Sequence, residues 1–254
     1  MPRLAKTIIP RIKKSIERRG VVASIFRGVL LPIQLFREHR TAKQSAGDGT
    51  RSEFDLKYIV DTDGDTGGVT FLSDLDIPSP NWIYGFNYLP VDPDQFRAAM
   101  TALKIEFEDF FFIDYGSGKG RALLFASNYP FKKIVGIEFA PELHAIAVKN
   151  IGKYSSPEQK CGSLEAVCMD FTDFSLPPEP LVLFFNRPCE ALPLGIVLGS
   201  IRKSLRENPR PIYIVFIAPA YEEIEAVLDG AEFLVKIAEN PDISFIVYES
   251  VQHA

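Results

Sequence analysis

The stretch 110-FFFIDYGSGKGRALLFA-126 places three glycines within five residues, between an apolar run and a helix-like run. Glycine adopts backbone conformations that a Cβ would forbid, so a loop of this composition can pass close to a ligand. A phosphate-binding P-loop requires a glycine where Ile113 stands and a serine or threonine where Gly120 stands. The dinucleotide fingerprint requires its third glycine where Arg121 stands. The spacing therefore argues against both phosphate-binding motifs.

A third pattern fits DYGSGKG, residues 114–120, because Asp114 is followed by glycines two, four and six positions later. This pattern resembles the first motif of class I S-adenosylmethionine-dependent methyltransferases and matches it at every position of that motif. The resemblance implies S-adenosyl-L-methionine as the cofactor. That cofactor has an amino-acid end and a sulfonium but no phosphate, so a carboxylate at Asp114 suits it. The alternative is an ordinary tight turn between a strand and a helix, which needs only one or two glycines.

Length and composition restrict the class of protein. A chain of 254 residues, 46% of them hydrophobic, can bury a sizeable core. The three cysteines lack C-x-x-C spacing and form no metal pattern with the three histidines, so we expect neither disulfides nor a metal site. The sequence contains no apolar run of the roughly 20 residues that span a bilayer, and its first residues do not resemble a signal peptide. We therefore expect a cytoplasmic protein.

Charge divides the chain into two unequal parts. Residues 1–43 contain eleven lysines and arginines and two acids, a net charge of +9, whereas the remainder has a net charge of −14. An acidic body repels phosphates, so we expect no nucleic-acid partner. The basic part places Ile9, Ile12 and Ile16 on one helical face, as in an amphipathic helix. Three interpretations stay open for it: peripheral contact with an anionic membrane, an organellar transit peptide, and packing against the acidic body.

The sequence predicts three consecutive segments. Residues 1–45 form a basic amphipathic helical extension, residues 46–90 a linker followed by an aromatic lid, and residues 91–254 the core. Within the second segment, residues 54–90 are expected to form short strands and loops. The core would then carry the cofactor site and the catalytic residues.

From residue 91 onward, strand-like and helix-like runs alternate, which is typical of a parallel sheet with helices on both faces. Strands are expected near residues 110–115, 133–138, 164–169, 180–186 and 212–218. Helices are expected near residues 93–104, 119–128, 141–151, 190–205 and 220–228. The chain then closes with two β-rich runs, FLVKIAEN and ISFIVYES, joined by a turn-like PD. A seven-stranded sheet with an antiparallel last strand is the layout of class I methyltransferases, so the element order predicts an α/β, doubly wound, mostly parallel, Rossmann-like sheet.

Residues at the carboxyl ends of parallel strands meet at one edge of an open α/β sheet, where ligands bind. Glu138 ends the second predicted strand, 24 residues after Asp114, where its carboxylate can accept both ribose hydroxyls. Asp170 ends the third, where it can accept the adenine amino group; the alternatives are a helix N-cap at Asp170 and a competing acid at Asp173. By the resemblance, the residues expected at the cofactor are Asp114, Gly116, Ser117, Gly118, Gly120, Glu138, Phe139, Asp170, Phe171 and Tyr88.

Asn186 ends the fourth predicted strand, where amine-modifying members of the family carry Asn or Asp followed by Pro-Pro and an aromatic residue. Here Arg187, Pro188 and Cys189 follow, so the match is partial. The side-chain carbonyl of Asn186 can hold the N–H groups of an amine in position for attack on the methyl group. Arg187 is either a solvated surface arginine or a site for a carboxylate or phosphate. We take Asn186, Arg187 and Tyr84 as the catalytic candidates.

Four aromatic residues lie within seven positions just before the core: Trp82, Tyr84, Phe86 and Tyr88. They predict either a lid over the cofactor or packing against the sheet edge, with Trp82 the strongest candidate for packing. Together with the glycine motif, this segment is similar to non-SET, seven-strand protein-lysine methyltransferases. The resemblance implies methyl transfer to an acceptor nucleophile such as a protein amine; a small-molecule acceptor and a non-catalytic cofactor-binding scaffold are the alternatives. Lys119, inside the loop, is expected to face solvent or the cofactor carboxylate.

Overall fold

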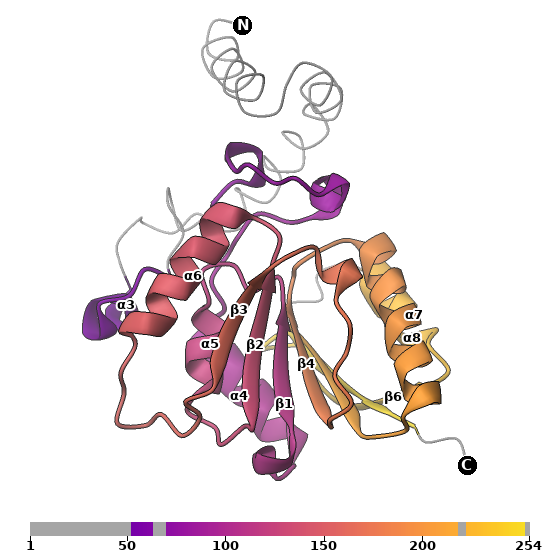
Figure 1. The fold of residues 1–254 in the computed structure, drawn as a ribbon. Coiled ribbons are helices and arrows are strands. Elements are labelled where there is room, and N and C mark those ends of the chain that lie inside the picture. The colour runs from indigo at the N-terminus through magenta and orange to yellow at the C-terminus, as the bar shows by residue number, and fades with distance from the viewer. Residues whose placement is uncertain (1–51, 63–69, 218–221, 252–254) are drawn as a thin grey trace, which may run out of the picture.

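The computed structural model of the chain describes residues 52–62, 70–217 and 222–251 (Figure 1). The expectations for the basic extension, residues 1–45, lie outside these ranges. Within the described ranges, no helix is long and apolar enough to cross a bilayer.

A seven-stranded sheet forms the centre of the molecule, with the strand order β3-β2-β1-β4-β5-β7-β6. The strands are β1 Phe111–Tyr115, β2 Lys133–Glu138, β3 Leu164–Cys168, β4 Leu181–Asn186, β5 Ile212–Ile217, β6 Leu234–Asn240 and β7 Phe245–Ser250. Strands β1 to β5 are parallel, and β7 lies antiparallel between β5 and β6. The predicted α/β fold is confirmed, and its sheet has the strand arrangement of class I methyltransferases.

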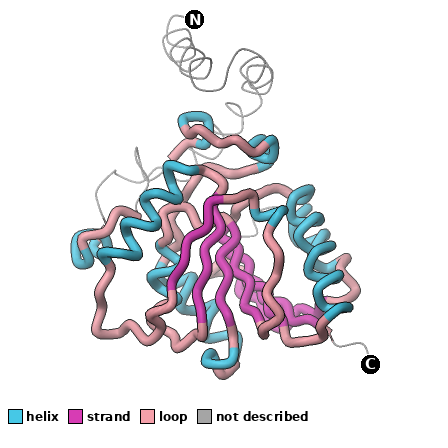
Figure 2. The backbone as a smooth tube through the Cα atoms, viewed as in Figure 1, coloured by secondary structure: helices cyan, strands magenta, loops and turns pink. Residues whose placement is uncertain are grey.

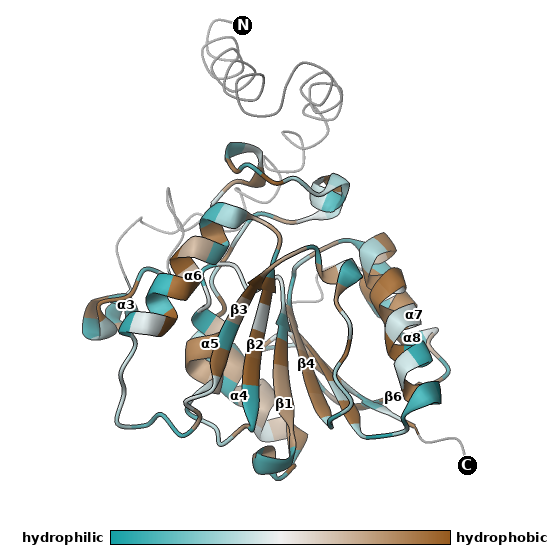
Figure 3. Ribbon diagram, viewed as in Figure 1, coloured by the Kyte–Doolittle hydropathy of each residue, from teal (hydrophilic) through white to brown (hydrophobic). Residues whose placement is uncertain are grey.

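Helices cover both faces of this sheet (Figures 1 and 2). The helices of the core are α4 Pro93–Leu103, α5 Arg121–Ala126, α6 Pro141–Lys153, α7 Ala191–Glu207 and α8 Glu222–Asp229. α4 and α5 pack on one face with Phe112 and Phe184, and α7 and α8 pack on the other with Ile113 and Phe185. Neighbouring residues of a strand point to opposite faces, so strands covered on both sides are mostly apolar. Figure 3 shows the central strands in the brown of hydrophobic residues.

The segment before α4 differs from the expected short strands and loops. It contains the helix α3, Glu53–Tyr58, and two 3-10 helices, Leu72–Asp74 and Pro80–Tyr84. The hydroxyl of Ser52 accepts a hydrogen bond from the Asp55 amide and so caps α3. The expectation was wrong because helices of six residues or fewer are too short to leave a periodic pattern in the sequence.

Strand-like pairing does occur in this segment, but only as single bridges in the part of it that the structure describes. Thr70 pairs with Tyr88, and Gly85 pairs with Cys189, both antiparallel. The second bridge joins the aromatic segment to the residues that follow β4. The aromatic segment therefore lies at the carboxyl edge of the sheet, where the predicted site is.

Candidate functional site

The glycine loop joins β1 to α5 at the carboxyl edge of the sheet. Gly116, Gly118 and Gly120 have φ angles of 81°, 54° and 86°, in the left-handed region that side chains rarely adopt. A Cβ on Gly118 would overlap the ring of Tyr88, and a Cβ on Gly116 would lie 2.7 Å from Cβ of Pro188. The chain's own side chains therefore require these two glycines, whether or not a ligand binds.

The amides of the loop donate their hydrogen bonds within the chain. Gly116 and Ser117 donate to the carbonyl oxygen of Ile137 at 2.9 and 3.0 Å, and Gly120 donates to that of Ser117 at 2.8 Å. Gly118 donates to Oε2 of Glu138 at 2.8 Å. A phosphate-binding loop instead points free amides at its ligand. The loop geometry thus agrees with the argument from glycine spacing against a phosphate.

Two buried carboxylates lie at the loop. Burial raises the pKa of Glu138 to about 7, although hydrogen bonds from the amides of Ala140, at 2.8 Å, and Gly118 lower it. Asp114, on β1, has a pKa well above its usual range because of its burial and the nearby charge of Glu138. Oδ1 of Asp114 and Oγ of Ser117 are buried without a hydrogen-bond partner. Such atoms are rare in native proteins and mark a place for a polar ligand or water.

One cavity opens beside the loop, and a second cavity shares part of its lining. The smaller has a volume of about 40 Å³ and the larger about 190 Å³. Predicted site residues that line the smaller cavity are Tyr88, Gly116, Glu138, Phe139, Phe171, Asn186 and Arg187. Asn186 and Arg187 also line the larger one, together with Asp92 and Gln95 at the start of α4. The structure therefore brings cofactor and catalytic candidates to one place at the carboxyl ends of β1, β2 and β4.

Asp170 fastens the aromatic segment to the end of β3. Its Oδ1 accepts hydrogen bonds from the amide and hydroxyl of Thr172 at 2.9 and 2.7 Å, which makes it the N-cap of the 3-10 helix Phe171–Asp173. Its Oδ2 accepts hydrogen bonds from Nδ2 of Asn81 at 2.9 Å and from the hydroxyl of Ser79. Burial raises the pKa of Asp170, but these hydrogen bonds outweigh it and the net shift is downward. These contacts are those of a helix N-cap, one of the alternatives predicted for Asp170.

The three catalytic candidates differ in their surroundings. Nδ2 of Asn186 donates to the carbonyl oxygen of Leu89 at 3.0 Å, and no described residue donates to its Oδ1. Arg187 has a left-handed backbone, with φ of 48°, and its Nε is buried without a partner. The carbonyl of Tyr84 accepts a hydrogen bond from the Glu190 amide at 2.9 Å, whereas the Tyr84 side chain lines neither of the two cavities. Asn186 and Arg187 therefore lie together, and Tyr84 stands apart from them.

In the aromatic segment, residues 82–88, Trp82 packs in an apolar cluster and Tyr88 covers the glycine loop. Trp82 is 4% exposed and lies in a small apolar cluster with Leu72, Ile77 and Leu143. Trp82 therefore packs against apolar side chains. This is the alternative to a lid that the sequence analysis favoured for this residue. Tyr88 belongs to the same cluster but also lines the smaller cavity beside the glycine loop.

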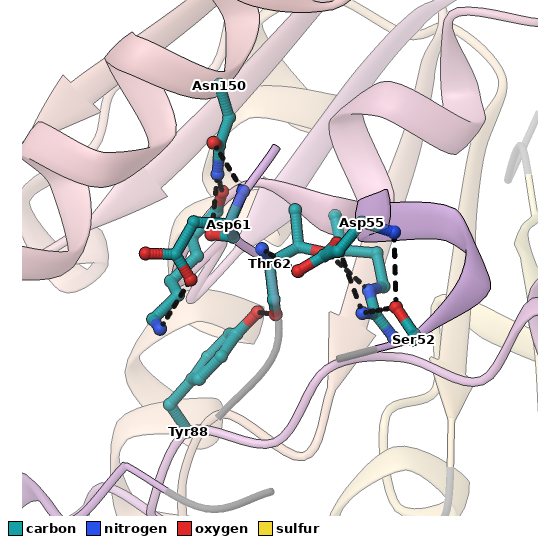
Figure 4. A network of polar contacts seen from close by, with 8 residues as sticks. Ser52, Asp55, Asp61, Thr62, Tyr88 and Asn150 are labelled. Carbon is teal, nitrogen blue, oxygen red and sulfur yellow. Dashed lines mark hydrogen bonds and ion pairs between the residues drawn. The ribbon is translucent and has the colours of Figure 1, made fainter. Parts of the chain in front are cut away.

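A buried polar network that the sequence did not reveal joins α3 to α5 (Figure 4). Nε of Arg121 donates to the hydroxyl of Thr62 at 2.6 Å, and its Nη2 lies 3.0 Å from Oγ of Ser52 and 3.5 Å from Oδ1 of Asp55. The Thr62 amide donates to Oδ2 of Asp55 at 2.6 Å. The side chains of Arg121 and Asp55 are only 7% and 0% exposed, so their charges compensate each other away from water.

The same network fixes Tyr88 over the glycine loop. The hydroxyl of Tyr88 donates to the carbonyl of Thr62, whose amide and hydroxyl are held by Asp55. The tyrosine ring lies against Gly118, because a Cβ on this glycine would come within 2.2 Å of two ring carbons of Tyr88. Residues 52–62 thus hold Tyr88, which lines the cavity beside the loop, although they lie far from the loop in the sequence.

Lys119 does not face solvent, which was one of the two alternatives expected for it. Its side chain is 3% exposed, and its Nζ lies 3.1 Å from Oδ1 of Asp61. Asn150 on α6 joins this pair by donating from Nδ2 to the carbonyls of Asp61 and Lys119 at 2.8 and 2.9 Å. The signal that could have revealed these contacts is the presence of Lys119 and Arg121 in an otherwise apolar and glycine-rich stretch, because buried cations need partners.

Comparisons with known proteins give similarity in structure alone. No protein-family model matches the chain, and no curated protein matches it in sequence. An RNA methyltransferase from Salinibacter ruber in complex with S-adenosyl-L-homocysteine is 18% identical, with 64% of this chain and 92% of that chain covered and a TM-score of 0.40. An rRNA methylase from Streptococcus thermophilus is 14% identical; the match covers 65% of this chain and 100% of that chain, with a TM-score of 0.42. A precorrin-6y C5,15-methyltransferase from Geobacter metallireducens is 16% identical, with coverage of 61% and 86% and a TM-score of 0.41.

These matches correct one expectation and leave another without support. The prediction that nucleic acid is not a partner is contradicted, because RNA methyltransferases are among the matched proteins. The weaker likeness to protein-lysine methyltransferases finds no support in the matches reported. At these identities and TM-scores, no conclusion about this chain's own substrate follows.

Proposed function

We propose that this chain is an S-adenosylmethionine-dependent methyltransferase whose cofactor lies against the glycine loop and Glu138. One observation carries the proposal: the Glu138 carboxylate accepts the Gly118 amide at 2.8 Å and lines the cavity beside the loop. A carboxylate at this point repels phosphate and accepts hydroxyl groups, so it favours a ribose over a pyrophosphate. The strand arrangement of the sheet, shared with class I methyltransferases, supports the same cofactor.

The proposed cofactor contacts follow from the chemistry of each side chain. Glu138 accepts the ribose hydroxyls, while Phe139 and Phe171, which line the same cavity, offer apolar surface to the adenine ring. Asp114 and Ser117 have unpartnered buried oxygen atoms that suit the polar amino-acid end. When bound, the cofactor supplies an electrophilic methyl group on its sulfonium.

The remaining cofactor candidates shape the site. Gly116, Gly118 and Gly120 give the loop its left-handed turns, and Tyr88 covers the loop from one side. Asp170 holds the 3-10 helix of the aromatic segment through Ser79 and Asn81. In this proposal Asp170 positions a wall of the site, because each of its two oxygens already accepts two hydrogen bonds within the chain.

We place the acceptor nucleophile at Asn186 and Arg187. The Asn186 amide is oriented by its hydrogen bond to the Leu89 carbonyl, which leaves Oδ1 able to accept an N–H or O–H of the acceptor. Tyr84, whose carbonyl holds the Glu190 amide, positions the segment after β4. A protein amine and a small molecule are both acceptors of this kind, and the reported matches give no support to the protein amine.

Transfer of a labelled methyl group tests the proposal. The full chain is incubated with tritiated S-adenosylmethionine and, separately, with the protein, RNA and small-molecule fractions of cells. We expect label in one fraction, lost with Glu138→Ala and kept with Glu207→Ala, whose side chain is 68% exposed on α7. Cofactor binding without transfer to any fraction favours the non-catalytic scaffold. Absence of both binding and transfer contradicts the proposal.

A further inference from the structure

Arg187, which is half-buried, differs from the two buried arginines of the described chain. Arg210 donates to the carbonyls of Glu179 and Pro177 at 2.8 and 2.7 Å, and Arg121 donates to Thr62 at 2.6 Å. By contrast, no described residue accepts a hydrogen bond from Arg187, whose Nε is buried without a partner. A guanidinium nitrogen that is removed from water without gaining an acceptor is destabilising. An acceptor from outside the chain would relieve this.

The backbone presents Arg187 from a fixed turn. Its left-handed conformation, with φ of 48°, is unfavourable for a residue with a side chain and persists where the surroundings hold it. On one side Asn186 is tied to the Leu89 carbonyl at 3.0 Å, and on the other the Pro188 carbonyl accepts the Phe86 amide at 3.3 Å. Both neighbours are therefore anchored to the segment that covers the site. A side chain presented in this way loses less freedom when it binds a ligand.

The charges around Arg187 leave it available to an anion. Asp92 lines the same cavity of about 190 Å³, but its Oδ1 accepts the amides of Asp94 and Gln95 at 2.8 and 3.1 Å and thereby caps α4. Among the residues with described positions, no carboxylate forms an ion pair with Arg187. Arg187 therefore remains open to an anion from outside the chain, while the carboxyl groups of Asp92 and Glu138 lie at the cavities that it lines.

We propose, on the basis of the proposed function, that the methyl acceptor carries an oxyanion that binds the guanidinium of Arg187 while its reacting N–H or O–H group lies at Oδ1 of Asn186. A carboxylate and a phosphate both present two oxygen atoms that match the planar fork of a guanidinium. Asn186 and Arg187 line both cavities, so one acceptor can reach the two side chains together. Arg187 is then a specificity-determining residue that selects anionic acceptors over neutral ones.

Titration with simple oxyanions tests this inference on the full chain saturated with S-adenosylhomocysteine. Inorganic phosphate and acetate are titrated separately by calorimetry at constant ionic strength. We expect saturable binding of at least one of them, weakened about tenfold by Arg187→Gln and less by Arg187→Lys, which keeps the charge but not the fork. The preferred anion indicates whether the acceptor's group is a phosphate or a carboxylate. Arg202→Gln, an exposed arginine on α7, is the charge-matched control and should bind as the unmodified chain does.

The outcomes separate this inference from the function on which it rests. Equal anion affinity in the unmodified chain and Arg187→Gln, or no saturable anion binding while S-adenosylhomocysteine binds, overturns the role of Arg187 alone. Failure of S-adenosylhomocysteine to bind the unmodified chain overturns the proposed function and this inference with it. The melting temperature of Arg187→Gln, compared with that of Arg202→Gln, shows whether Arg187→Gln is folded. If Arg187→Gln does not fold, the anion affinity of Arg187→Lys relative to the unmodified chain decides the test instead.

Discussion

At the scale of a residue, Glu138 combines burial with a proposed cofactor contact that requires its charge. Burial raises its pKa to about 7, so near neutral pH about half of the empty protein carries an uncharged Glu138. The ionised carboxylate is the better acceptor for ribose hydroxyls, since both of its oxygens can only accept. A ligand that donates hydroxyls therefore binds the ionised form more tightly, and its affinity should increase as pH rises through 7.

We accordingly expect the affinity for S-adenosylhomocysteine to increase between pH 6 and pH 8. Glu138→Gln, which cannot ionise, should bind more weakly and with a smaller pH dependence. Calorimetric titration at several pH values measures both, with Glu207→Gln as the control that should retain the full dependence. A constant affinity over this range in the unmodified chain, or an unchanged slope in Glu138→Gln, would show that Glu138 does not contact the ligand.

Gly118 gives a second prediction at this scale. In Gly118→Ala the new Cβ would meet the ring of Tyr88, at a backbone φ of 54° that alanine disfavours. We expect a loss of about 1–3 kcal/mol in the free energy of unfolding and weaker cofactor binding. Gly199 on α7 has open space at its Cβ position, so Gly199→Ala should instead stabilise the protein by about 0.5–1 kcal/mol. Urea unfolding compares the two variants, and equal effects would be inconsistent with a loop that requires glycine.

At the scale of an element, α3 is attached to α5 by a buried ion pair. Asp55→Ala removes this carboxylate from beside the guanidinium of Arg121, whose side chain is only 7% exposed. We expect it to lower the free energy of unfolding by about 3–5 kcal/mol. Asp94→Ala removes one partner of an exposed pair with Arg97 and should cost less than about 1 kcal/mol. Similar losses for the two variants in urea unfolding would mean that the Asp55 contact does not hold α3 in place.

The elements of the core could be predicted from sequence because their signals are local. β2, for example, spans the predicted residues 133–138, and β4 begins one residue after its predicted start. The glycine loop and the residues ending β2 and β4 could also be placed, because the carboxyl ends of parallel strands meet at one edge. Whether those residues bind the cofactor stays a prediction.

The contacts before α4 could not be predicted, since their partners are distant in sequence. Arg121 is 66 residues from Asp55, and Lys119 is 58 residues from Asp61. No periodicity or spacing connects such pairs. For Asp170 the two alternatives, a helix cap and an adenine contact, share one sequence pattern, and only the hydrogen bonds to Thr172 separate them.

At the scale of the whole molecule, a segment that precedes the predicted core boundary at residue 91 packs against the core. Residues 52–62 supply Asp55 and Asp61, the partners of two buried cations in the glycine loop and the start of α5. We expect a chain beginning at residue 63 to be less stable than a chain beginning at residue 46 by more than about 3 kcal/mol. Thermal or urea unfolding of the two truncated chains measures the difference. Equal stability would place residues 52–62 outside the cooperative unit.

Binding of S-adenosylhomocysteine to the full chain, measured by calorimetry, tests the central claim most directly. We predict saturable binding with one site per chain, weakened by about 1–3 kcal/mol in Glu138→Ala, because the ribose hydroxyls lose their acceptor. Glu207→Ala should bind as the unmodified chain does. The absence of binding at millimolar ligand, or equal affinity in Glu138→Ala, would contradict a cofactor held at the glycine loop and Glu138.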